Sequence, residues 1–464
     1  ARHRAWPRAS PEITRMDTER ISAALREASD TRHLLIEAGA LAAADRMLAD
    51  AFGDAPAVLV ADENTFAAAG AAVQERLRAA GRAMGEPIVF PGAPALYADF
   101  ATVLALEERL RGQDAVPVVV GSGTLNDITK LAAHRLGRQY MCVGTAASMD
   151  GYTAFGAAIT ADGFKQTMAC PAPRAVLADL EVLARAPAEM NATGYGDLLG
   201  KVTAGADWLL ADALEIEPID SRAWPLVQDQ LRDWTGQPDL LRAGDRLAVA
   251  SLFEGLLMAG VAMQISASSR PASGSEHRFS HLWEMQALGR GKPAVPHGFK
   301  VGVGTIAAAA LYERVLACDL TLVDIEARCA AWPSRDEVEL KVLKAHDIPP
   351  LAENAVEETL AKYITAEQLR ERLLLLRGRW PAIRTSLERQ LLPAAQLRDL
   401  LARAGCPTEP GAIGLAPAQL RESYWLARTI RSRYTVLDLV YETGILDECV
   451  AELFAPSGYW GQAR

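Results

Sequence analysis

The sequence has little of several features that define whole classes of protein. Only six of its 464 residues are cysteine, and no two of them form a C-x-x-C pair. This usage favours reduced thiols in a cytoplasmic protein over a disulfide framework or a zinc knuckle. No block of Lys or Arg stands out, and the formal net charge is −10. We therefore expect neither nucleic acid nor a membrane surface as a main partner.

Long apolar runs are also scarce. The first 20 residues contain none, so we expect no signal peptide there. One stretch, 247–265, is almost wholly apolar, yet it contains Ser251, Glu254 and two glycines. These residues favour a helix buried inside a domain over a membrane span.

The residues that are present suit a globular protein with two domains. Half of them are hydrophobic, 23% are charged, and the chain is long enough for two large cores. We predict a tail over 1–30 that ends in a short helix, an α/β domain over 31–185 and a helical domain over 186–464.

The first domain alternates short apolar runs with amphipathic helices, which is typical of a mostly parallel sheet covered on both faces. Strands are predicted at 57–61, 87–90, 117–121 and 140–143, and helices at 65–80, 100–110 and 126–136. In the second domain helical periodicity is clearest at 197–214, 246–266, 304–318, 336–344, 366–376 and 417–429.

A glycine-rich turn, G-S-G-T-L-N-D, follows the predicted strand at 117–121. Glycines at Gly121 and Gly123 would let a diphosphate approach the backbone, and the helix N-terminus that follows would favour the anion. The turn is neither G-x-G-x-x-G nor a Walker loop. An ordinary strand-to-helix turn capped by Thr124, Asn126 or Asp127 is the alternative.

Two more segments end predicted strands of the same sheet, where open α/β sheets place their ligands. One is the small, polar turn over 144–152. The other is Asp62, a carboxylate placed either to meet ribose hydroxyls or to cap the helix after it.

A candidate metal site stands in the second domain. His277 and His281 are four residues apart, so on a helix they share one face. His297 is predicted in a loop over 291–298, and Asp197 follows two glycines near a predicted helix N-terminus. One Asp and two or three His suit a borderline divalent metal with one coordination position left open. Core histidines and an N-cap aspartate are the alternative interpretation.

Together these segments resemble the dehydroquinate synthase-like and metal-dependent alcohol dehydrogenase superfamily, and within it the bacterial AraM-type sn-glycerol-1-phosphate dehydrogenases. The resemblance rests on G-S-G-T-L-N-D-I-T-K (121–130), T-A-A-S-M-D-G-Y-T (145–153), G-Y-G-D-L-L-G-K (194–201), S-G-S-E-H-R-F-S-H (273–281), H-G-F-K-V-G-V-G-T (297–305), A-G-C-P-T (404–408) and T-I-R-S-R-Y-T-V-L-D (429–438).

The resemblance implies an N-terminal dinucleotide-binding domain, an all-α C-terminal domain and an active site in the cleft between them. The metal would be held by Asp197, His277 and His297, and Asp150 and His281 would lie with Asp197 on the substrate side. Residues implied for the pyrophosphate, in the first glycine turn, are Gly121, Gly123, Thr124, Leu125, Asn126 and Asp127. Thr145 and Ser148 would line the cofactor, and Asp62 would meet the adenosine ribose.

The implied reaction is the reversible, NAD(P)H-dependent reduction of dihydroxyacetone phosphate to sn-glycerol 1-phosphate, with one divalent metal, zinc or nickel, polarising the carbonyl. His281, Asp150 or a water would supply the proton. We expect a small phosphorylated substrate and, from the resemblance alone, a homodimer.

Three alternatives remain. The substrate could be an unphosphorylated polyol such as glycerol. A dehydroquinate synthase is disfavoured because Asp127 is followed by Ile128-Thr129-Lys130 rather than by Gly-Phe. A non-catalytic dinucleotide-binding protein with a structural metal would be expected to add cysteine ligands to the histidines.

Overall fold

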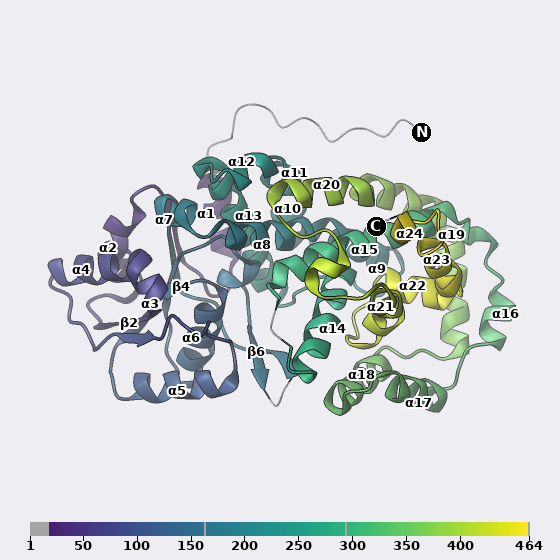
Figure 1. The fold of residues 1–464 in the computed structure, drawn as a ribbon, viewed down its shortest axis with the longest axis horizontal. Helices are drawn as coiled ribbons and strands as arrows, with labels where there is room; N and C mark the ends of the chain where they lie inside the picture. The colour runs from purple at the N-terminus through teal and green to yellow at the C-terminus, as the bar shows by residue number, and fades with distance from the viewer. Residues whose placement is uncertain (1–17, 162–163, 293–294, 463–464) are drawn as a thin grey trace. The chain divides into compact units, whose positions relative to one another are not determined.

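The computed structural model describes residues 18–161, 164–292 and 295–462 (Figure 1). Contacts within the chain define two compact units. Unit 1 extends to Leu198 and adds Ser221–Ala272 and Arg403–Gly405, whereas unit 2 comprises Leu199–Asp220, Ser273–Ala402 and the chain from Cys406. The predicted boundary at 185/186 separates the sheet from the later helices, but the units follow contacts, and segment 221–272 packs with the sheet domain.

Unit 1 is built on a six-stranded sheet in which every pairing is parallel, as predicted. The strand order is β1 (His33–Glu37), β8 (Ala175–Asp179), β5 (Met141–Gly144), β4 (Val116–Gly121), β2 (Ala57–Asp62) and β3 (Ile88–Phe90). The antiparallel hairpin β6 (Ala157–Ala161) and β7 (Phe164–Met168) was not predicted. Strands β1 and β8 were not predicted individually either.

The central strands are mostly apolar because helices cover both of their faces. Ala57, Leu59 and Ala61 of β2 share a core cluster with Leu48 of α2 (Ala44–Phe52) and Val73 of α4 (Ala71–Ala79). Side chains alternate along a strand, so the buried residues between them point to the opposite face. Helix α6 (Gly123–Arg135) contacts β2 and β4, and α5 (Phe100–Arg111) packs on α6.

Short helical segments complete the sheet region. They are η1 (Ala40–Ala43), α3 (Glu63–Thr65), the π-helical turn η2 (Phe66–Gly70), η3 (Asp150–Tyr152) and α7 (Leu180–Arg185). The helix predicted over 65–80 is thus α4 preceded by a wider turn.

Helix α13 (Arg246–Ser266) is the apolar stretch singled out from the sequence. Among the described residues, it is the one helix that is both long enough and apolar enough to cross a membrane. However, 89% of its apolar window is buried inside the structure. It contacts α1 (Thr18–Glu27), α7, α10 (Ala223–Gln228), α11 (Leu231–Trp234) and α12 (Pro238–Arg242). Its Glu254 pairs with Arg20 of α1. The prediction of a buried core helix is confirmed.

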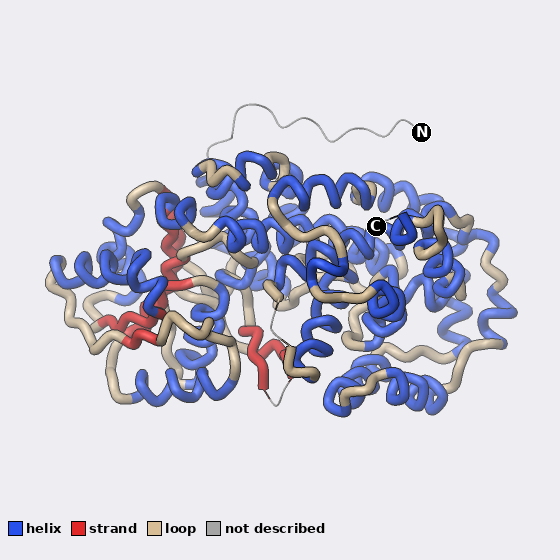
Figure 2. The backbone as a smooth tube through the Cα atoms, in the orientation of Figure 1, coloured by secondary structure: helices blue, strands red, loops and turns tan. Residues whose placement is uncertain are grey.

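The chain after the sheet is helical, as Figure 2 shows. Its remaining elements are α8 (Ala188–Leu199), α9 (Lys201–Ala213), α14 (Ser275–Gly289), α15 (His297–Ala317), η4 (Leu320–Leu322), α16 (Ile325–Ala330), α17 (Arg335–Ala345), α18 (Pro349–Ala361), α19 (Ala366–Gln390), α20 (Ala394–Ala404), η5 (Pro410–Ile413), α21 (Pro417–Thr429), α22 (Val436–Thr443), α23 (Leu446–Leu453) and α24 (Tyr459–Gln462). Helices α14 and α15 make the most extensive helix–helix contact of unit 2.

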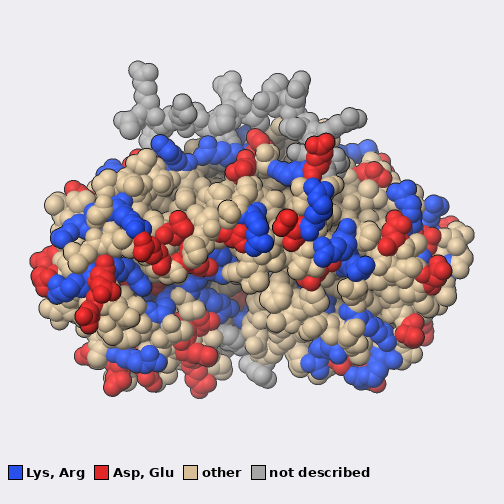
Figure 3. Space-filling view, turned by 180° about the vertical axis from the view of Figure 1, so that it is seen from behind, with Lys and Arg blue, Asp and Glu red and all other residues tan. Residues whose placement is uncertain are grey.

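Charged side chains of both signs are interspersed on the face of the molecule shown in Figure 3. Lys and Arg do not merge there into one continuous basic surface, which accords with the acidic net charge of −10.

Candidate active site

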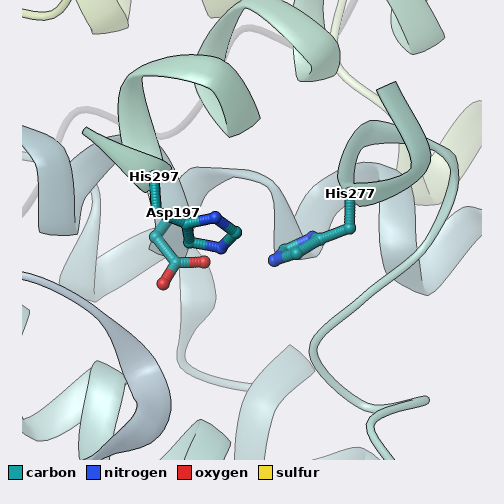
Figure 4. A group of neighbouring side chains, drawn as sticks. All are labelled: Asp197, His277 and His297. Carbon is teal, nitrogen blue, oxygen red and sulfur yellow. The ribbon is translucent and has the colours of Figure 1, made fainter. Parts of the chain in front are cut away.

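Three predicted metal ligands, Asp197, His277 and His297, lie together in the structure. Each offers one ligand atom, and these atoms all lie within 4.8 Å of one another. In Figure 4 a ring nitrogen of His277 points toward the Asp197 carboxylate and the His297 ring. Two ligands that each stand about 2.1 Å from an ion are roughly 3–4 Å apart, so small side-chain adjustments suffice. One carboxylate and two imidazoles form a donor set that fits a divalent ion with an open position.

The two imidazoles come from packed helices of unit 2. His277 lies in the first turn of α14 and His297 is the first residue of α15, and their ring centroids are 5.3 Å apart. His281 lies one turn after His277 on α14, with its ring 5.8 Å from His277 and 5.9 Å from His297. The expectation that His277 and His281 share a helix face therefore holds in the geometry.

The position of His297 corrects one sequence expectation. The loop predicted over 291–298 ends earlier, because Pro296 is the N-cap of α15 and the helix begins at His297 rather than near 304. Proline commonly precedes or opens a helix, since its missing N–H leaves no helical hydrogen bond unmade. The imidazole is thus fixed by a helix start.

The position of Asp197 corrects a second sequence expectation. The helix predicted over 197–214 is two helices that meet at Gly200, and Asp197 lies in the last turn of α8. The glycines before it do not mark a helix start. A Cβ on Gly194 would lie 1.9 Å from the carbonyl oxygen of Ala147, so glycine lets α8 approach the 145–150 segment closely.

That close approach brings a backbone donor to the Asp197 carboxylate. The N–H of Asp150 donates to Asp197 Oδ2 over 3.1 Å. Asp197 is fully buried. Asp150 is the first residue of η3 and is half-buried, so the segment predicted to line the substrate side is tied to the predicted ligand.

Sequence reasoning missed Glu276, the residue before His277. Its side chain is fully buried, and its Oε1 lies 2.8 Å from His277 Nδ1. The N–H of Gly274 donates to the same oxygen, and the hydroxyl of Thr203 donates to Oε2 over 2.7 Å. A carboxylate on one ring nitrogen orients the other toward a metal. The E-H pair inside S-G-S-E-H was the available signal.

A second buried carboxylate lies nearby in unit 2. Asp207 accepts hydrogen bonds from the Tyr312 hydroxyl and from the N–H groups of Ser275 and Val436. Burial, then the charge of Glu276, raises the pKa of Asp207. Burial would also raise the pKa of Glu276, but the hydrogen bond and charge of His277 lower it below its usual value. These opposite shifts make Glu276 the easier of the two carboxyl groups to ionise.

The environment of His281 keeps its ring neutral. Burial lowers its pKa well below the usual range, and the positive charges of Arg431, His277 and His297 act in the same direction. A neutral imidazole can accept a proton as well as donate one.

The first glycine turn joins β4 to α6. Helix α6 begins directly after Ser122, whose side chain does not cap it. A Cβ on Gly121 would lie 2.6 Å from a methyl carbon of Leu125, and one on Gly123 would lie 3.0 Å from the Met149 side chain. Thr124 lies half-buried in the same first helical turn.

Two residues of this turn serve the fold. The Asn126 side chain donates to the carbonyl oxygen of Gly151 and accepts from the Tyr140 hydroxyl. Asp127 Oδ2 accepts from the N–H of Ala158, and its burial raises its pKa against the opposing charge of Lys130. Their side chains thus fasten α6 to the segment after β5.

Lys130, which the sequence analysis did not assign, completes this fastening. It is 1% exposed, and its Nζ donates to the carbonyl oxygens of Gly151, Ala154 and Gly156 at 2.9, 3.0 and 2.9 Å. By donating to three carbonyl oxygens, the charged amine of Lys130 fixes the segment that contains Asp150.

The remaining predicted cofactor residues lie at the carboxyl ends of neighbouring strands. Asp62 ends β2 and caps α3, with its Oδ1 accepting from the N–H of Thr65 over 2.7 Å. Thr145 and Ser148 follow β5 and are largely buried, and the Thr145 N–H donates to the Gly121 carbonyl oxygen of β4.

Comparison with known families matches residues 35–187 to the iron-containing alcohol dehydrogenases. The glycerol-1-phosphate dehydrogenase (NAD(P)+) of Geobacillus stearothermophilus is 31% identical over 386 residues, which span 83% of this chain and 86% of that protein. The chain belongs to the glycerol-1-phosphate dehydrogenase family. This family uses NAD(P)+, which accords with the parallel sheet and its glycine turn.

Other comparisons agree with this membership. The family member of Halalkalibacterium halodurans is 38% identical over 256 residues, 55% of this chain and 64% of that protein, so that match spans slightly less than two thirds of the relative. The crystal structure of glycerol dehydrogenase from Schizosaccharomyces pombe superimposes with a TM-score of 0.56 and 14% identity, covering 91% of this chain and 90% of that one. At that identity the likeness establishes the fold.

Proposed function

We propose that this chain reduces dihydroxyacetone phosphate to sn-glycerol 1-phosphate with NAD(P)H, reversibly, at a divalent metal held by Asp197, His277 and His297. The observation that carries the proposal is the convergence of these three side chains within 4.8 Å, in a chain that belongs to this family. A divalent ion there would supply a Lewis acid for the substrate carbonyl.

The dinucleotide is assigned to the domain over 31–185. Gly121, Gly123, Thr124 and Leu125 would present the N-terminus of α6 to the pyrophosphate, since a helix N-terminus favours an anion. For Asn126 and Asp127 the contribution would be the rigidity of the turn, because their side chains bond elsewhere. Thr145, Ser148 and Asp62 would line the same strand ends, where such sheets bind ligands.

His281 and Asp150 are assigned to the substrate. His281 is neutral beside the two histidine ligands, so its ring would exchange a proton with the substrate oxygen. Asp150, tied through its N–H to Asp197, would orient the substrate hydroxyls. Of the nearby cations, Arg278 and Lys300 already pair with Asp438 and Glu284, at 2.9 and 3.1 Å.

The assay that tests the proposal compares dihydroxyacetone phosphate with dihydroxyacetone as substrates of zinc- or nickel-loaded protein, with both reduced cofactors. We expect turnover of the phosphate ester, and loss of at least 100-fold in kcat together with the bound metal in His297→Ala. The exposed His134→Ala is the matched control and should retain both. A preference for free dihydroxyacetone would favour the unphosphorylated-polyol alternative, and full turnover without metal would refute the site.

Three finer assignments accompany the proposal. The metal is zinc or nickel, since an Asp-plus-two-His set suits either. The protein is a homodimer, which sedimentation of the full chain would test. Its compartment is the cytoplasm, in keeping with six cysteines that form no disulfide bond with one another in the structure.

A further inference from the structure

Unit 2 contains a cavity of about 350 Å³ that the proposed reaction does not use. Its walls come from α17, α18, α19, α21 and α22 and from the loop between the last two. Part of the sequence motif 429–438 lies in that loop. Asp197, His277, His281 and His297 are not among the residues that line the cavity.

Cations outnumber carboxylates around this cavity. The Asp438 carboxylate forms ion pairs with Lys362 and Arg278, with nitrogen–oxygen distances of 2.7 and 2.9 Å. A guanidinium nitrogen of Arg428 lies 4.0 Å from the same carboxylate. Glu442 pairs with Arg372. Lys362, Arg372 and Arg428 line the cavity together with Asp438 and Glu442, whereas Arg278 pairs with Asp438 from outside the lining. The lining residues therefore carry an excess positive charge of about one in a largely buried setting.

Arg428 is the least satisfied of these cations. It is 5% exposed, its guanidinium lies 3.9 Å from the ring centroid of Tyr441, and its Nε is buried without a hydrogen-bond partner among the described residues. Guanidinium groups that are buried normally carry planar, paired hydrogen bonds to an anion. The face of this group is stacked on Tyr441, and the residue also lines the cavity.

The electrostatics of Lys362 agree with an uncompensated positive charge. Its pKa lies well below the usual value because of burial and then because of the charge of Arg278, against the opposing charge of Asp438. The negative charge of an anion bound in the cavity would raise this pKa.

We propose that this cavity is a second binding site, for a small phosphomonoester. A phosphomonoester carries about −1.5 to −2 charges at neutral pH, which would offset the excess positive charge of the lining residues and of Arg278 behind Asp438. Arg428 and Lys362 would hold the phosphate, and the aromatic walls formed by Trp332, Tyr363 and Tyr441 would contact the organic group. The volume lies at the lower end of the range of small-molecule sites.

Isothermal titration calorimetry with phenyl phosphate tests the site, with benzoate as the matched monoanion. We expect wild-type protein to bind phenyl phosphate at least tenfold more tightly than benzoate. Arg428→Met should weaken phenyl phosphate binding at least tenfold. Arg421→Met, on the exposed face of the same helix, should leave it unchanged, as should His297→Ala at the metal site.

A second variant guards against misfolding of Arg428→Met. Ala361 lines the cavity from an exposed position at the end of α18, so Ala361→Trp would take up space in the cavity with little risk to the core. We expect it also to weaken binding at least tenfold. No binding by the wild type, equal binding of benzoate, binding that survives Ala361→Trp, or binding lost only in His297→Ala would each overturn the proposal.

Discussion

At the scale of single residues, the candidate site depends on side chains that do not themselves face a substrate. Glu276 holds one nitrogen of His277 and is held in turn by Thr203 and the N–H of Gly274. Lys130 plays the same part in unit 1, where it closes the segment that carries Asp150. Both are buried charges whose partners are within reach, which is the condition under which burial is tolerated.

Substitution of Glu276 should weaken metal binding before it affects the fold. Glu276→Gln keeps the shape of the side chain but removes the charge that orients and polarises His277, so we expect the metal affinity to fall about 10- to 100-fold. Chelator competition with zinc or nickel measures this affinity. The matched control is Glu313→Gln, a carboxylate of α15 outside the described site. An unchanged affinity in Glu276→Gln would show that His277 needs no orienting partner.

Substitution of Lys130 should cost stability. Lys130→Met leaves three buried carbonyl oxygens without their shared donor, and we expect a loss of about 2–4 kcal/mol in the free energy of unfolding. Urea denaturation of the metal-free protein provides the measurement, and Lys344→Met, at an exposed position of α17, provides the comparison. Equal midpoints for the two variants would contradict a structural role for the Lys130 amine.

At the scale of secondary-structure elements, periodicity predicts what is buried better than where an element begins. The run at 247–265 predicts α13 almost to the residue, because an apolar helix with one paired carboxylate has few alternatives. The start of α15 and the end of α8 were missed. The start of α15 follows a local signal, the N-cap Pro296, that the prediction did not use. The close approach of α8 at Gly194 depends on long-range packing that spacing along the chain does not contain.

The packing of α8 supplies a test at this scale. In Gly194→Ala the new methyl group would meet the carbonyl oxygen of Ala147 at 1.9 Å, so the helix must move away and carry Asp197 with it. We expect a loss of about 1–3 kcal/mol in stability, as for other overpacked sites, together with weaker metal binding.

The control for this test is another helical glycine. Gly378 lies inside α19, and a Cβ there would meet nothing within 4 Å. Gly378→Ala should therefore stabilise the protein by about 0.5–1 kcal/mol, because alanine favours the helix. Calorimetric unfolding measures the stability of both variants. If Gly194→Ala matched the wild type in stability and in metal affinity, the close approach of α8 to Ala147 would be contradicted.

At the scale of the whole molecule, the order of motifs predicts the class of fold and the three clustered side chains, but not how the chain divides. Four strands, the parallel sheet and the helical second half follow from local patterns. The compact units do not, because residues 221–272 pack with the sheet domain through contacts distant in sequence. Lys130 escaped notice for a similar reason, since its carbonyl partners lie more than 20 residues away, whereas Glu276 stood beside His277 in the sequence.

Whole-molecule stability should also depend on pH through one buried histidine of unit 2. His346 is 7% exposed, its Nε2 lies 2.8 Å from the Thr429 hydroxyl, and burial lowers its pKa from 6.5 to about 4. Between these values the unfolded chain binds a proton that the folded chain does not. The stabilisation is therefore complete above pH 6.5 and is lost as the pH falls toward 4, by up to about 3 kcal/mol.

The test records thermal midpoints from pH 7 to 4.5. We expect His346→Gln to show a weaker dependence of stability on pH than the wild type, and the exposed His134→Gln to follow the wild type. Parallel curves for His346→Gln and wild type would show that this imidazole is protonated alike in the folded and unfolded chains.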